Sequence, residues 1–131
     1  IRNGLDVCII ACGRTVYESL VAAENLAKEG INAAVINCHT IKPIDEKTII
    51  SAAKKTKAIV TAEEHQINGG LGSAVSEVLA KFAPTPIEFV AIQNTFGESG
   101  DPQKLLEKYQ CTHQNISQAV KKVLKRKMTH E

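Results

Sequence analysis

The stretch IVTAEEHQINGGLGS, residues 59–73, decides how this chain folds. It continues an apolar, β-rich run over residues 58–62 with charges on both sides, which is typical of a parallel strand buried on both faces. Apolar residues then recur at helical spacing, which predicts an amphipathic helix. The inward face of that helix should comprise Leu71, Val75, Val78, Leu79 and Phe82. The stretch therefore predicts a strand, a charged loop and a glycine-rich helix start.

Polar residues lie between this strand and this helix, at the carboxyl end of the strand. In open α/β sheets, that edge is where binding sites are built. Glycines at a helix start can also present free backbone N–H groups to an anion. The residues of this candidate interface or anion site are Glu63, Glu64, His65, Gly69, Gly70, Gly72 and Ser73.

Each half of the candidate site has two interpretations. The acidic pair with His65 could form a general acid/base cluster, because a carboxylate can orient an imidazole. Consecutive residues of an extended segment point in different directions, so at most two of the three can meet one ligand. The alternative is a charged loop that hydrogen-bonds to its own backbone or crosses an interface. The glycines could bind an anion or let the helix pack closely, and the lack of a neighbouring lysine or arginine favours packing.

The alternation of strand and helix extends in both directions from this stretch. Further buried strands are predicted at residues 6–11, 33–37 and 87–92. The helix after the first strand should end at Gly30, with Val16, Leu20, Ala23 and Ala27 on its inward face. Strands alternating with helices predict a single α/β domain over residues 1–131, with a mostly parallel sheet and helices on both faces.

Capping residues indicate where the remaining helices begin. Asp45 is a suitable N-cap for a helix after the second strand. Asp101-Pro102 predicts the start of a short helix, and Thr112 can cap the final one. The expected inward faces are Ile49, Ala52 and Ala53 in the first of these, and Ile116, Ala119, Val120, Val123 and Leu124 in the last.

The start of the chain predicts one more strand. The first residue is Ile1 rather than Met, which indicates a piece of something longer. Asn3-Gly4 follows, and this dipeptide is a hairpin signal. We therefore expect residues 1–2 to be the stub of an antiparallel edge strand.

Composition and charge exclude several kinds of partner. The 131 residues are 44% hydrophobic and 23% charged, as in an ordinary globular domain. Sixteen basic against fourteen acidic residues give a net charge of +2, which is too balanced for a nucleic-acid or membrane partner. No apolar run reaches membrane-spanning length and there is no signal-peptide pattern, so the expected location is the cytoplasm.

The four cysteines are expected to be reduced. Cys8 and Cys12 are four residues apart, a spacing that matches neither a zinc knuckle nor a redox pair. Cys38 beside His39 could form a metal or nucleophile pair. The favoured interpretation is that these residues and Cys111 are apolar filler in a cytosolic protein.

Motifs for nucleotide binding and for common catalytic sites are missing. The first strand is followed by Gly13 alone, not by the three spaced glycines of a dinucleotide fingerprint, and there is no P-loop. No Ser-His-Asp set, zinc-ligand set or EF-hand loop can be assembled.

Several motifs nevertheless follow one another in a specific order. They are DVCIIACG at 6–13, IKPID at 41–45, VTAEEH and GGLGSAV at 60–65 and 69–75, FGESG at 96–100, and LLEKYQCTHQNI at 105–116. Together they resemble the C-terminal domain of transketolases in the thiamine-diphosphate-dependent family. The resemblance covers essentially the whole chain. It implies a Rossmann-like three-layer α/β/α fold with a five-stranded mixed sheet whose first strand is antiparallel.

The resemblance also implies an activity for a parent enzyme. That enzyme would transfer a two-carbon ketol unit from a ketose phosphate to an aldose phosphate, using thiamine diphosphate and Mg²⁺. The same domain occurs in deoxyxylulose-phosphate synthases and in β subunits of 2-oxoacid dehydrogenases, and His65 favours transketolase among the three.

The family's cofactor-binding motifs belong to its other domains. The Gly-Asp-Gly…Asn motif for metal and diphosphate and the activating glutamate have no counterpart here, since Gly100-Asp101 is followed by proline. We therefore expect no catalytic, cofactor-binding or metal residue in this chain, and no activity from it alone. Its expected role is to support assembly with the N-terminal and middle domains of a homodimeric enzyme. A small-anion or regulatory binding module and a stand-alone enzyme at the same edge are the alternatives.

Overall fold

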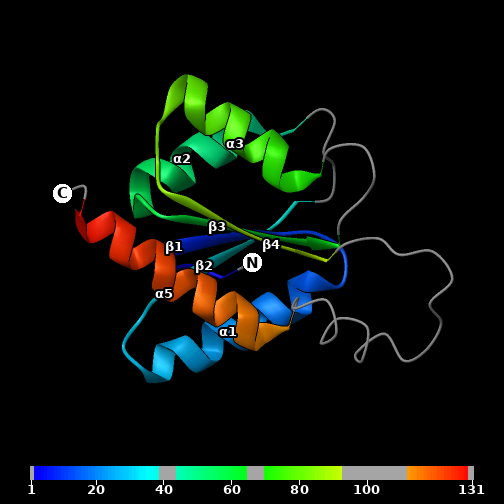
Figure 1. Cartoon of the computed structure of the whole chain (residues 1–131), viewed down its shortest axis with the longest axis vertical. Coiled ribbons are helices and arrows are strands. Elements are labelled where there is room, and N and C mark those ends of the chain that lie inside the picture. The colour runs from blue at the N-terminus through cyan, green and yellow to red at the C-terminus, as the bar shows by residue number, and fades with distance from the viewer. Residues whose placement is uncertain (1, 39–43, 65–69, 93–111, 130–131) are drawn as a thin grey trace, which may run out of the picture.

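The structure is a computed structural model that describes residues 2–38, 44–64, 70–92 and 112–129. Its elements in chain order are β1 (Val7–Ala11), α1 (Thr15–Lys28), β2 (Ala33–Asn37), α2 (Glu46–Thr56), β3 (Ile59–Glu64), α3 (Leu71–Phe82), β4 (Ile87–Ile92) and α5 (His113–Thr129). The four strands are parallel, in the order β2-β1-β3-β4. Figure 1 shows the sheet between two layers of helices, α2 and α3 on one face and α1 and α5 on the other. The predicted three-layer α/β/α fold is confirmed.

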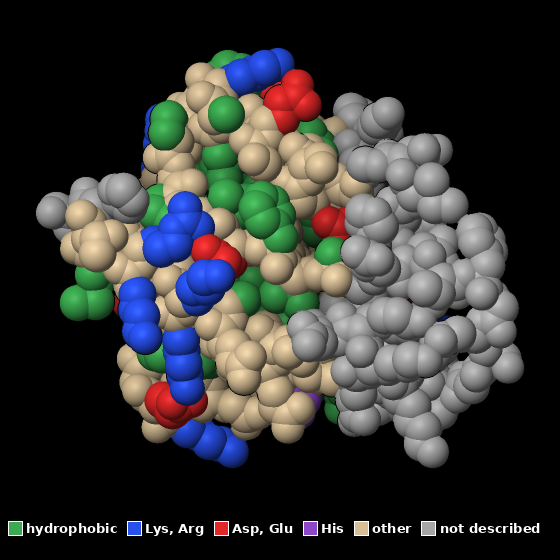
Figure 2. Space-filling model, in the orientation of Figure 1, with side chains coloured by type: hydrophobic (Ala, Val, Ile, Leu, Met, Phe, Trp, Pro, Cys, Tyr) green, Lys and Arg blue, Asp and Glu red, His purple; other side chains and the backbone are tan. Residues whose placement is uncertain are grey.

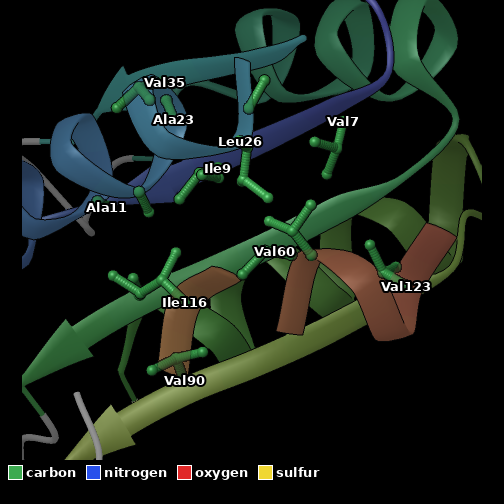
Figure 3. Packing of buried hydrophobic residues seen from close by; sticks show 14 of the residues in the cluster. Val7, Ile9, Ala11, Ala23, Leu26, Val35, Val60, Val90, Ile116 and Val123 are labelled. Atoms are coloured by element: carbon green, nitrogen blue, oxygen red, sulfur yellow. The ribbon is translucent and has the colours of Figure 1, made fainter. Parts of the chain in front are cut away.

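The core consists of two clusters, one on each face of the sheet. β1 lies between β2 and β3, and all five of its residues are buried. On one face Ile9 packs in a cluster with Leu26 of α1 and Ile116 of α5 (Figure 3). On the other face Cys8 and Ile10 pack with residues of α2 and α3. Because each large aliphatic side chain contributes ~1.5–3 kcal/mol when fully buried, these faces hold the three layers together.

The predicted antiparallel strand is not seen, so the described sheet has four strands rather than five. A single antiparallel bridge joins Arg2 to Val35 of β2, with N–H···O bonds of 3.2 and 3.0 Å. The hairpin prediction at Asn3-Gly4 was wrong, because the favoured tight turn needs positive φ and neither residue has it. Gly4 instead allows a close approach to β2, since a Cβ there would lie 2.5 Å from the carbonyl carbon of Ala33.

α1 packs on the sheet with most of its predicted face, since Ala23 is buried and Val16 and Leu20 pack against the same cluster, but its buried face also includes polar residues. Ala27 is exposed, while Val16 and Leu20 are only half-buried. The fully buried side chains of α1 are those of Thr15, Glu18, Ser19, Ala22, Ala23 and Leu26. Polar residues can lie on this face because their groups find partners there, as the Ser19 hydroxyl does with the Thr15 carbonyl. The end of the helix was predicted correctly, and Gly30 has the expected positive φ of +84°.

The other predicted helix faces agree more closely with the structure. Asp45 caps α2, and its carboxylate accepts a 3.1 Å hydrogen bond from the Thr48 N–H. Phe82 is the exception in α3, because 53% of it is exposed. The short helix predicted at Asp101-Pro102 lies outside the described residues. The predicted inward residues that are buried are Ile49, Ala52, Ala53, Leu71, Val75, Val78, Leu79, Ile116, Val120 and Val123.

Candidate functional site

The carboxyl edge of the sheet contains the point where the chain changes direction across the sheet. From β1 the chain adds β2 on one side, then returns to add β3 and β4 on the other. The N–H of Cys12, just after β1, donates to the Ala62 carbonyl of β3 at 3.2 Å, and the N–H of Cys38 donates to Ala11 at 2.8 Å. Ligands of open α/β sheets bind outside the strand ends at such a point. The predicted site residues that the structure describes lie at this edge, namely Glu63, Glu64, Gly70, Gly72 and Ser73.

Glu63 closes the start of α3. One oxygen of its carboxylate accepts a 2.7 Å hydrogen bond from the N–H of Leu71, and the other accepts a 2.6 Å bond from the N–H of Gly72. The side chain is nearly inaccessible, with 5% of the residue exposed. An anionic group suits this position, because the first N–H groups of a helix lack intrahelical partners and its dipole is positive there.

The glycines at this helix start make room for that carboxylate. A Cβ on Gly70 would lie 1.8 Å from Oε1 of Glu63, and one on Gly72 would lie 3.2 Å from Oε2. Neither glycine has positive φ, so backbone strain does not explain them. Glycine is needed at both positions because the buried Glu63 side chain approaches the backbone closely. This agrees with the interpretation that the glycines allow close packing. An incoming small anion would have to displace Glu63 from both N–H groups.

Glu64 lies on the opposite face of the sheet from Glu63. Both belong to β3, where they pair with Ala91 and Ile92 of β4, and successive residues of a strand point to opposite faces. The Glu64 carboxylate lies 4.0 Å from Nε of Arg14, at the start of α1. Both side chains are substantially exposed, so this ion pair contributes little to stability. The two glutamates therefore do not converge on one ligand.

Phe89 continues the candidate site onto the outer surface of β4. A Cβ on Gly72 would lie 2.7 Å from Cδ1 of Phe89, so the ring covers the start of α3, yet 54% of Phe89 is exposed. Ser73, the next predicted site residue, is also exposed. Figure 2 shows hydrophobic side chains gathered over β4 between α3 and α5. Phe89 is a site residue that the sequence reasoning missed, because its apolar strand position predicted burial.

Two of the predicted site residues, His65 and Gly69, lie outside the described residues. Among the rest, the structure brings Glu63, Gly70 and Gly72 together and directs Glu64 elsewhere. No three His, Cys, Asp or Glu side chains of the described residues are grouped so as to hold a metal ion.

The start of α1 supplies further residues that the sequence reasoning missed. The Thr15 hydroxyl lies 2.6 Å from the Cys12 carbonyl and 2.7 Å from the Ala62 carbonyl, so it ties α1 to the ends of β1 and β3. Glu18, one turn further, is a buried carboxylate with 2% of the residue exposed. Their place in the first turns of a helix that follows a strand could have indicated a role at this edge. However, threonine and glutamate in a helix are usually expected to face solvent.

The thiol of Cys12 lies in a negatively charged surrounding. Burial raises the pKa of Cys12 to about 11, and the nearby charges of Glu63, Cys38 and Glu64 act in the same direction. Burial likewise raises the pKa of Cys8 to about 12. Both thiols are therefore protonated at neutral pH, which disfavours an activated cysteine nucleophile here.

A cavity of about 390 Å³ lies at the other edge of the sheet, near the amino ends of β3 and β4. Its lining includes Lys54, Lys57 and Lys127, and it lies where α2 and α3 end and near the end of α5. Cations are favourable at helix carboxyl termini, which accounts for the lysines without a ligand. This cavity is remote from the Glu63 cluster.

The start of α3 does not offer the N–H groups of Leu71 and Gly72 to a diphosphate such as that of thiamine diphosphate. Its diphosphate would need free donors or a metal ion, and the N–H groups at the start of α3 that would suit it are held by Glu63. A second negative group beside that buried carboxylate would be repelled.

No helix in the described part of the chain is long and apolar enough to cross a membrane.

Comparison with known proteins places this fold and site in context. A family model described as transketolase, C-terminal domain, matches residues 1–116. The chain is 46% identical over 127 residues to the 6-deoxy-6-sulfo-D-fructose transketolase subunit of Clostridium sp. strain MSTE9, covering 97% of this chain and 39% of that protein. It is 40% identical to the 1-deoxy-D-xylulose-5-phosphate synthase of Desulforudis audaxviator, covering 86% of this chain and 18% of that protein.

A solved structure shows the same fold. It is described as a split gene transketolase, an inactive beta4 tetramer, and matches with a TM-score of 0.87 and 46% identity over 95% of this chain and 41% of that one. The chain thus spans well under half the length of these relatives. The family match, the shared fold and the ordered motifs agree, and the chain belongs to the transketolase C-terminal domain family.

Proposed function

We propose that this chain is a non-catalytic C-terminal section of a transketolase-type enzyme and supports its assembly. The observation that carries the proposal is the Glu63 carboxylate, which occupies the start of α3 from within the chain. The position that an anionic substrate or cofactor would use is therefore part of the domain's own packing. A helix start whose N–H groups are bonded within the chain is suited to packing against another domain.

The proposed contact surface is the exposed side of β4 beside the start of α3. Phe89 supplies an exposed aromatic ring, and Ser73 lies near it on the first turn of α3. β4 is the last strand of the described sheet on this side. Aromatic residues are enriched at protein interfaces, where a ring that is half-exposed in one domain can be fully buried against the next.

The cofactor chemistry belongs to the rest of the enzyme in this proposal. Thiamine diphosphate and Mg²⁺ would bind the N-terminal and middle domains of the enzyme, and the chain described here spans 39% of its transketolase relative. The reaction would be transfer of a two-carbon ketol unit between sugar phosphates. The whole enzyme would be a homodimer, with this chain contributing to the interface. A deoxyxylulose-phosphate synthase is the competing parent, since such enzymes are also relatives.

A ketol-transfer assay tests the proposal. The chain is assayed alone, and again with the cofactor-binding portion from the same source, using thiamine diphosphate, Mg²⁺ and pentose phosphates. We expect activity only in the mixture. Replacing the acceptor with glyceraldehyde phosphate and the donor with pyruvate tests the deoxyxylulose-phosphate alternative. Activity of the chain alone would overturn the non-catalytic role, and Glu63, Glu64 and His65 would then be the residues to mutate.

A further inference from the structure

Two cysteines far apart in the sequence lie side by side at the carboxyl edge of the sheet. β1 and β2 pair in parallel register up to Ala11 opposite Asn37, so the next residues, Cys12 and Cys38, come opposite each other. The 2.8 Å hydrogen bond from the Cys38 N–H to the Ala11 carbonyl continues the ladder to this point. Both cysteines pack against the hydrophobic cluster on the α2 and α3 face, so their side chains share one face.

This placement meets the geometric requirement for a disulfide. Neighbouring strands lie ~4.7–4.9 Å apart, inside the ~4.4–6.8 Å that separates the Cα atoms of bonded cysteines. Neither cysteine forms a disulfide in the structure, and both residues are half-buried, whereas Cys8 is buried. Cys8 shares their face but is fully buried in the middle of β1, where it pairs with Ala34. Cys12 and Cys38 are therefore the matched and accessible pair among the described residues.

We propose that Cys12 and Cys38 form a redox-sensitive dithiol that a low-molecular-weight disulfide converts to an intramolecular disulfide. One cysteine, as thiolate, attacks the small disulfide, forms a mixed disulfide and releases one small thiolate. The other then attacks the cysteine sulfur of that mixed disulfide and releases the second. The two cysteines lose two electrons and two protons in total, and the small disulfide is reduced to two thiols.

The bond would link the carboxyl ends of β1 and β2 and close a loop that contains α1. It would also change the surroundings of Glu63, whose charge acts on the Cys12 thiol. Attack by Cys12 should be slow near neutral pH, because its pKa lies near 11 and little of its thiolate is present. Mildly alkaline conditions should therefore speed that step. Neither a partner domain nor a cofactor is needed, so failure here would leave the assembly role untouched.

Oxidation of the folded chain by glutathione disulfide tests the proposal. The chain is incubated at mildly alkaline pH with graded ratios of oxidised to reduced glutathione, quenched with acid, and measured by intact mass. We expect loss of two hydrogens without a retained glutathione. Trypsin should then yield residues 3–14 linked to residues 29–47, because cleavage is expected after Arg2, Arg14, Lys28 and Lys47 but not at Lys42-Pro43.

Single variants assign the sulfur atoms, since residues 3–14 contain both Cys8 and Cys12. The bridge should persist in Cys8→Ser and in the matched control Cys111→Ser. Cys12→Ser and Cys38→Ser should each stop at a single glutathione adduct on the remaining partner. Circular dichroism checks that each variant is folded, and wild-type chain oxidised in concentrated urea shows how the four cysteines pair without the fold.

Three results would overturn the proposal. One is a folded wild-type chain that keeps both thiols, or carries glutathione on both, across the whole redox series. Another is a bridge that survives Cys12→Ser or disappears in Cys8→Ser. The third is a folded chain whose disulfide pairing is the same as that formed in urea. The choice of cysteines would then not depend on the neighbouring strands.

Discussion

The carboxylate of Glu63 accepts a 2.6 Å hydrogen bond from the backbone N–H of Gly72, nine residues later in the chain. With the parallel bond from Leu71, it joins the end of β3 to the start of α3. An ionised acceptor on unpaired helix N–H groups makes a charge-assisted contact, which is stronger than a neutral hydrogen bond. This relationship explains why glycines occupy the helix start and is the source of the first two predictions.

Glu63→Gln should destabilise the domain by ~1–3 kcal/mol, because the amide keeps one acceptor oxygen and turns an NH₂ group toward the other backbone N–H. Urea unfolding at neutral pH measures the loss. Glu77→Gln is the control, since Glu77 makes only an exposed 3.3 Å ion pair with Lys81 one turn away. That change should cost no more than ~0.5 kcal/mol. Equal losses in the two variants would contradict a structural role for the Glu63 carboxylate.

Gly70→Ala should destabilise the domain more than Gly72→Ala. The new methyl group of the first would meet the hydrogen-bonded carboxylate of Glu63, whereas that of the second mainly meets the exposed ring of Phe89, which can move. Overpacking of this kind costs ~1–3 kcal/mol. A double-mutant cycle with Glu63→Ala is the decisive measurement, because truncating Glu63 removes the obstacle. We expect most of the Gly70→Ala penalty to vanish in that background, and an unchanged penalty would show that it arises elsewhere.

Phe89→Ser should weaken association with the cofactor-binding portion of the enzyme about tenfold or more, which corresponds to ~1.4 kcal/mol, while leaving the isolated fold largely intact. Isothermal titration calorimetry with that portion gives the affinity. Met128→Ser is the matched control, because Met128 is also an exposed apolar residue, 74% accessible, but lies near the end of α5. If Met128→Ser weakens binding and Phe89→Ser does not, the interface lies away from β4.

Stability should fall as the pH rises above 9. Folding raises the pKa of Cys8 from 9.0 to about 12 and that of Cys12 from 9.0 to about 11. At a pH between the unfolded and the folded pKa, the unfolded chain has lost the thiol proton and the folded chain still binds it. Raising the pH in this window therefore favours the unfolded chain and lowers the free energy of unfolding. The contribution is complete below pH 9 and is lost progressively toward pH 11 and above.

The test of this pH dependence compares slopes rather than absolute stabilities. Each fully shifted thiol contributes ~1.4 kcal/mol per pH unit in this window. Urea unfolding from pH 8 to about pH 10.5 should show a shallower decline in Cys8→Ala than in the wild type, and Cys111→Ser serves as the reference. An identical decline in Cys8→Ala would mean that groups other than this thiol govern alkaline unfolding.

Much of the architecture could be predicted from local patterns. The run at residues 58–62, the stripe of apolar residues in α3 and the Asp45 cap all depend on neighbours within a few positions. The cap occurs as predicted, and the stripe is buried apart from Phe82. The strand forms, but β3 extends to Glu64, so Glu63 and Glu64 belong to it and not to the predicted charged loop. The polar part of the α1 face could not be predicted in this way. Thr15 is buried because the Ala62 carbonyl at the end of β3 gives its hydroxyl a partner, and apolar periodicity cannot indicate such a contact.

The candidate site divides along the same line. Sequence alone located the carboxyl end of β3 and the glycines after it, because strand, loop and helix start are consecutive in the chain. The sequence did not show that Glu63 accepts hydrogen bonds from the N–H groups of Leu71 and Gly72. That contact depends on how closely the start of α3 packs against β3. The exposure of Phe89 depended on β4 being the outermost described strand on its side.

By itself, the sequence determined the order and type of the described helices and strands, the faces of α2, α3 and α5, and membership of the transketolase C-terminal domain family. The tertiary structure decided that Arg2 makes a single bridge instead of a strand, that Glu63 caps α3, and that the β1–β2 register runs up to Ala11 opposite Asn37, just before the two cysteines. Periodicity is a property of consecutive residues, so it can be read along the chain. Strand order and register become defined only when the strands pair in the folded sheet. They decide which distant residues come into contact, and the site depends on those contacts.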